Sequence, residues 1–66
     1  MQIVLNGRTL EPEEPCALGA LLREHGIDPA TVVVELNRSI LPASEVEERG
    51  LDDGDQLEVV RIVGGG

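Results

Sequence analysis

One stretch of this chain has the spacing of an amphipathic helix, and that stretch limits what the remaining residues can form. Leu18, Leu21 and Leu22 recur at intervals of three and one residues, and Gly26 ends the pattern directly after His25. The other apolar runs are β-branched or alternate with polar residues, which is typical of strands. Since one short helix covers one face of a sheet, the sequence predicts a small α+β domain.

The strand-forming segments are separated by recognisable turns. Asn6-Gly7 is a strong hairpin signal, and the Asp52–Asp55 segment contains a glycine and reads as a tight turn. Alternation places Val32, Val34 and Leu36 on one face of a strand. We expect strands at residues 2–5, 8–10, 32–36, 39–41 and 57–63.

A second, shorter helical turn is expected at residues 44–47. Ser44 and Glu47 have the spacing of a capping box, in which Ser44 is the N-cap and Glu47 reaches back to the backbone. Gly50 is expected to close this turn. The aspartates of the 52–55 turn lack the distant glutamate of a calcium loop, so no metal site is predicted there.

The predicted order is hairpin, helix, strand, short extended piece and strand, which is the order of the β-grasp, or ubiquitin-like, fold. The first and last strands would then lie parallel at the centre of a mixed sheet, joined through a crossover that contains the helix. The expected core contacts join the leucines of the helix to strand residues Ile3, Leu5, Leu57 and Val59.

The last strand runs directly into Gly64, Gly65 and Gly66. Consecutive glycines are entropically costly to order and offer no side chain to pack, so we expect residues 1–63 to form the domain and 64–66 a free tail. Three residues extend about 10 Å, and a chain without Cβ atoms fits a narrow channel. We interpret Gly66 as the working group, with a frayed end or engineered remnant as the alternative.

The composition restricts the partners of the domain. A formal net charge of −8 opposes binding to nucleic acid, whose phosphates attract lysine and arginine. An acidic surface suits a basic protein surface, although it also serves solubility. The single Cys16 excludes an internal disulfide, and the sequence shows neither a secretory signal nor a membrane-length apolar run, so we expect a cytoplasmic protein.

Val60 and Ile62 are apolar but are predicted to face away from the helix. They form either a docking patch for a partner or ordinary scattered aliphatic surface. The sequence has no nucleophile, base and orienting acid in combination, and no glycine-rich phosphate loop with its lysine. We therefore expect no catalytic residues and no ATP site of its own.

Three segments together resemble the ThiS-type sulfur carriers of thiamine thiazole synthesis: residues 36–42, 53–57 and 62–66. The length and order of elements match over essentially the whole chain. The resemblance implies that a ThiF-like enzyme adenylates the Gly66 carboxylate with ATP and Mg, and that a cysteine-derived sulfur donor converts it to a thiocarboxylate. It also implies a ThiG-like thiazole synthase as acceptor, with no cofactor bound to the carrier itself.

Two other functions remain open from the sequence. A carrier of the same kind delivers sulfur to molybdopterin or to transfer RNA, and the small subunit of molybdopterin synthase is similar in fold and tail but usually longer. A β-grasp binding module with an inert tail belongs to a different functional class.

Overall fold

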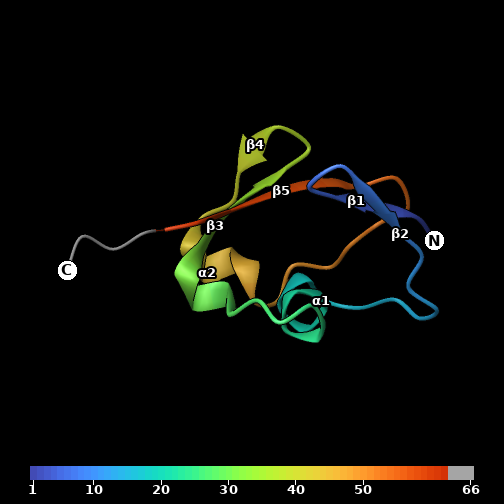
Figure 1. Ribbon diagram of the computed structural model, residues 1–66, viewed down its shortest axis with the longest axis horizontal. Coiled ribbons are helices and arrows are strands. Elements are labelled where there is room, and N and C mark those ends of the chain that lie inside the picture. Colours follow the sequence, from blue (N-terminus) through green and yellow to red (C-terminus); the bar gives the residue numbers. More distant parts are fainter. Residues whose placement is uncertain (63–66) are drawn as a thin grey trace.

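A computed structural model describes residues 1–62 of the protein. The elements are β1 (Ile3–Leu5), β2 (Arg8–Leu10), α1 (Leu18–Glu24), η1 (Pro29–Thr31), β3 (Val32–Leu36), β4 (Ser39–Ile40), α2 (Ala43–Val46) and β5 (Gln56–Arg61). The five strands form one sheet in the order β2-β1-β5-β3-β4, and both α-helices lie on one side of it (Figure 1). The predicted boundary after residue 63 and the tail 64–66 lie outside the described residues and stay predictions.

β5 occupies the centre of the sheet. It pairs in parallel with β1, where Leu5 lies beside Leu57, and antiparallel with β3 along the whole of that strand. A parallel pairing needs a crossover connection, and α1 lies within it. The β-grasp order expected from the sequence is therefore confirmed.

The core is entirely aliphatic and contains the residues expected from the sequence pattern. Leu18, Leu21 and Leu22 of α1 are buried with Ile3 and Leu5 of β1, and Val59 packs against this cluster while partly exposed. The remaining buried hydrophobic residues are Val32, Val34, Leu36, Val46, Leu51 and Leu57. No helix within residues 1–62 combines the length and hydropathy needed to cross a bilayer.

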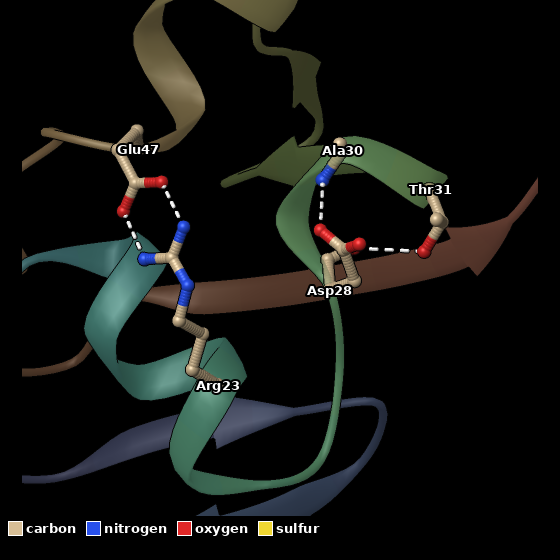
Figure 2. A network of polar contacts seen from close by, with 5 residues as sticks. All are labelled: Arg23, Asp28, Ala30, Thr31 and Glu47. Atoms are coloured by element: carbon tan, nitrogen blue, oxygen red, sulfur yellow. Dashed lines mark hydrogen bonds and ion pairs between the residues drawn. The ribbon is translucent and has the colours of Figure 1, made fainter.

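The predicted capping box at Ser44 is wrong. α2 begins one residue earlier, after Pro42, and no side chain caps its first turn. Glu47 instead receives two hydrogen bonds from the guanidinium of Arg23 in α1, as Figure 2 shows. A bidentate, charge-assisted pair is stronger than a bond to a neutral backbone amide, which explains why Glu47 turns away from its own helix.

The pairing with Arg23 also affects the titration of Glu47. Its pKa is lowered, chiefly by the hydrogen bonds from Arg23 and also by the nearby positive charge. Both side chains are about half exposed, so solvent and salt screen the pair. Its main consequence is geometric, because it joins α1 to the segment that follows α2.

Backbone hydrogen bonds complete this junction. The amides of Leu18 and Gly19, at the start of α1, donate to the carbonyl oxygens of Arg49 and Glu47 at 2.8 and 3.1 Å. These bonds replace the missing side-chain cap, because the N-cap residue is Ala17. Gly50 pairs with Ala17 in an isolated bridge, so it does not close the α2 turn as predicted.

Candidate functional site

The end of β5 is the part of the described structure nearest to the predicted glycine tail. Backbone pairing with β1 stops at Leu57, whose carbonyl accepts a 2.9 Å hydrogen bond from the Asn6 amide. The Asn6 side chain then takes over: its Oδ1 accepts from the Val59 amide at 2.7 Å, and its Nδ2 donates to the Val59 carbonyl at 3.2 Å. One side chain therefore extends the parallel pairing beyond β1.

The other edge of β5 is held as far as the last described residue. The Ile62 amide donates to the carbonyl of Thr31 at 2.9 Å, and Thr31 is the last residue of η1. Asp28 caps η1 by accepting a 2.9 Å bond from the Ala30 amide on Oδ1, while its own carbonyl accepts from the Thr31 hydroxyl at 2.8 Å (Figure 2). The capped turn supports the strand where it leads to the tail.

Sequence reasoning missed both of these anchors. Asp28-Pro29 blocks continuation of the preceding helix, but an N-cap aspartate followed by proline is also a helix start signal, and the sequence-based prediction did not use it. The role of Asn6 carried no such signal, because Val59 is 53 residues away in the sequence.

The structure confirms that Val60 and Ile62 point away from the core. They are 58% and 56% exposed. Val33 lies directly opposite Val60 in the β3–β5 register and is also exposed, so its side chain joins theirs on the face without helices. We call Val33, Val60 and Ile62 the apolar patch. Val33 and Val60 are cross-strand partners, and Ile62 lies two residues beyond Val60 on the same face, so the three residues are adjacent.

The carboxylates of the acidic turn before β5 accept hydrogen bonds from neighbouring segments. Asp53 accepts a 2.6 Å bond from the Gln2 amide, and Asp55 accepts from the Asp52 amide at 2.7 Å and from the Asn37 side chain at 3.1 Å. These bonds join the N-terminal segment, the β3–β4 turn and the 52–55 segment, in agreement with the interpretation of the last as a turn. No group of three or more His, Cys, Asp or Glu residues within residues 1–62 has the arrangement of a metal site.

The remaining candidate residues lie elsewhere. Cys16 packs, partly buried, against the core just before α1, and His25 is the exposed C-cap residue of that helix. Gly64, Gly65 and Gly66 lie outside the described residues. The structure thus brings the apolar patch together beside the end of β5 and leaves Cys16 and His25 outside it.

Replacing Asn6 by glycine tests the side-chain extension of the sheet. Glycine accepts the positive φ of 48° but loses both bonds to Val59, so we expect the free energy of unfolding to fall by about 1 kcal/mol. Urea denaturation followed by circular dichroism measures this. Asn6→Asp keeps only the acceptor and should lie between the two proteins, whereas equal stability of Asn6→Gly and wild type would contradict the role of the side chain.

Comparison with known proteins adds a family relationship. A ThiS family model matches residues 2–66. The sulfur carrier protein ThiS of Thermus thermophilus is 40% identical over 94% of this chain and 95% of its own length. A thiazole synthase of Paramagnetospirillum magneticum is 39% identical over the whole of this chain, which spans 20% of that longer protein. The crystal structure of the thiamine biosynthesis protein ThiS from Geobacter metallireducens superimposes with a TM-score of 0.79 at 29% identity, covering both chains completely.

Proposed function

The chain belongs to the ThiS family, and on that premise we propose that it carries sulfur on the Gly66 carboxylate for the synthesis of the thiazole of thiamine. It is a small sulfur carrier and a co-substrate, not a catalyst. Similarity to a sulfur carrier along almost its full length, and to a thiamine biosynthesis protein in structure, supports this function.

The chemistry starts from an unreactive group. A free α-carboxylate is ionised at neutral pH and lacks a leaving group. In the proposed cycle an oxygen of the Gly66 carboxylate attacks the α-phosphorus of ATP, supported by Mg in the partner enzyme, and pyrophosphate leaves. Sulfide released from a cysteine-derived donor then attacks the acyl carbon and displaces AMP, which leaves a thiocarboxylate on Gly66.

The observation that carries the proposal is the way β5 ends. Asn6 holds one edge at Val59, and Thr31 holds the other at Ile62, so the strand is positioned up to four residues before Gly66. Four residues reach at most about 14 Å, which is enough to enter the active site of a docked partner. A positioned strand end reduces the conformational freedom that is lost when the terminus is bound.

The proposed partners are a ThiF-like adenylating enzyme, a ThiG-like thiazole synthase and a cysteine-derived sulfur donor, all acting in the cytoplasm. A thiazole synthase that contains, within one polypeptide, a region similar to this whole chain supports the second of these partners. Gly64 and Gly65 are proposed to pass through the partner's channel, and Val60 and Ile62 to contact its surface.

Intact-mass measurement tests the function. The protein ending at Gly66 is incubated with ATP, Mg, the adenylating enzyme and a sulfur donor, and a variant lacking Gly66 is the matched control. We expect the wild type to gain the mass difference between one sulfur and one oxygen, and the control to remain unchanged. An unmodified wild type, under conditions that modify a known carrier, would indicate a binding module with an inert tail.

Val60→Asp tests the docking role of the apolar patch. A carboxylate in an apolar interface is desolvated without a partner, so we expect the KM for the carrier in the adenylation reaction to rise about tenfold or more. Stability should change by only about 0.5 kcal/mol because Val60 is exposed. Ala20→Asp adds the same charge to an exposed position of α1, on the other face of the sheet, and should have little effect on the KM. Unchanged kinetics of Val60→Asp would remove the patch from the interface.

A further inference from the structure

The face of the sheet opposite the helices carries two carboxylates in direct opposition. Glu35 of β3 is the cross-strand partner of Glu58 in β5, and on its other side Glu35 pairs with Ile40 of β4. Cross-strand partners project their side chains to the same face of a sheet. These three residues therefore form a row across three strands, and the Val33–Val60 pair lies two residues away along each strand, on the same face.

Neither carboxylate forms an ion pair within residues 1–62. The ion pair found there joins Arg23 to Glu47, on the side of the helices. Arg38 lines the same surface hollow as Glu35 and Glu58 but forms no ion pair with them. Because like charges directly opposite each other destabilise a sheet, this arrangement weakens the isolated domain.

Apolar side chains border the pair on two sides. The Val33–Val60 pair of the apolar patch borders it on one side, and Ile40, 69% exposed, ends the row. An arginine suits such a place, because its stem packs on aliphatic side chains while its planar guanidinium donates to two carboxylates. A lysine supplies the same charge with less directional bonding.

The geometry points to this face as the docking surface for the adenylating enzyme, with a basic side chain of that enzyme, best an arginine, bound between Glu35 and Glu58. The inference rests on the proposed function and adds the charged contact to it. The apolar patch continues from this pair to Ile62, the last described residue before the glycines, so a protein bound here lies beside the start of the tail.

Charge favours the adenylating enzyme as the occupant. An enzyme that binds ATP surrounds the phosphates with cationic groups, so the region that receives the tail has a positive potential. The chain carries a net charge of −8, and the carboxylate pair places two of its negative charges on the face beside the patch. Complementary charge at this position speeds encounter and orients the carrier for entry of the tail.

Removing one charge of the Glu35–Glu58 pair should stabilise the domain but weaken its binding to the adenylating enzyme. Glu58→Gln removes one repelling charge, so its midpoint of urea denaturation should be higher than that of wild type. The same change removes a contact to the basic side chain, so the KM for the carrier in the adenylation reaction should rise about tenfold at low salt. That difference should shrink at high salt, where charges are screened. Glu35→Gln is the second variant and should behave in the same way.

Glu48→Gln is the matched control. Glu48 is an exposed glutamate in the turn that follows α2, where it lines a surface hollow with Ser44, Glu45 and Arg49. Its substitution makes the same change in net charge but should alter neither the denaturation midpoint nor the KM. If the KM rose equally in Glu48→Gln and Glu58→Gln, the effect would come from net charge alone, and the proposed contact at Glu35 and Glu58 would be wrong.

Four further outcomes separate the possibilities. An unmodified wild type in the mass assay would contradict the proposed function itself and, with it, the identity of the partner. A modified wild type whose KM equals that of both glutamine variants would overturn only the docking assignment. If Glu58→Gln were adenylated normally but transferred sulfur poorly to thiazole synthase, the synthase would be the protein that binds this face. Dimerisation in sedimentation experiments, strengthened by Glu58→Gln, would indicate that a second copy of this chain binds this face. Either of these last two results would overturn the adenylating enzyme as its partner.

Discussion

Gly65→Val is expected to abolish formation of the thiocarboxylate while leaving the domain folded. The branched side chain adds bulk to a segment proposed to cross a narrow channel, and a small displacement of the reacting carboxylate reduces the rate by about 100-fold or more. Intact mass and the rate of pyrophosphate release measure the loss. The free energy of unfolding should equal that of wild type, because the substituted residue lies beyond the strand that packs on the core.

One control protein and a second tail variant complete this test. Ala20→Val adds a branched side chain at an exposed position of α1, away from the tail, and should retain adenylation. One residue added after Gly66 keeps every glycine but moves the carboxylate, and should be as inactive as Gly65→Val. Full activity of either tail variant would contradict passage through a narrow channel to a reaction at Gly66.

Gly19→Ala is expected to destabilise the domain by about 2 kcal/mol, although alanine is the better helix former by about 1 kcal/mol. A Cβ atom at residue 19 would lie 2.7 Å from the backbone carbonyl oxygen of Glu47, which also accepts the hydrogen bond from the Gly19 amide. The carbonyl is part of the junction between α1 and the segment after α2, so it cannot move without loss of that bond. A domain of this size has only a few kcal/mol of stability, so the loss is large.

Circular dichroism in urea is the suitable measurement, because the chain contains no aromatic residue to serve as a fluorescent probe. Gly50→Ala is the matched control: its Cβ would meet no atom within 4 Å, and its backbone is outside the left-handed region. We expect Gly50→Ala to unfold close to the wild-type midpoint. A Gly19→Ala protein as stable as this control would show that the helix junction tolerates a methyl group.

The two substitutions separate function from stability. Gly65→Val should lose sulfur loading with an unchanged midpoint, whereas Gly19→Ala should lose stability and keep loading at temperatures where it is folded. If Gly65→Val unfolded the domain, the glycines would have a structural role that the proposed function does not include.

Element types and their order were predictable from short-range patterns. The alternation of Val32, Val34 and Leu36 identified a strand and its buried face, and the leucine spacing with Gly26 identified α1. The exposure of Val60 and Ile62 followed from the same alternation. These patterns suffice because the period of a helix or strand is set within a few residues of backbone geometry.

The partners of polar side chains were not predictable in this way. Ser44 and Glu47 fit a local capping motif, yet Arg23 lies 24 residues away and binds Glu47 more strongly. Asn6 reads as a turn residue, and its side chain also supports Val59, 53 residues further along the chain.

The amino-acid pattern therefore established the α+β class, the β-grasp order, the aliphatic core and the outward direction of the residues beside the tail. The folded chain decided the ion pair at Glu47, the anchoring of β5 by Asn6 and Thr31, and the opposition of Glu35 and Glu58. The physical reason is that periodicity is a property of neighbouring residues. A hydrogen bond or a charge contact, in contrast, depends on which groups the strand register brings within a few ångströms.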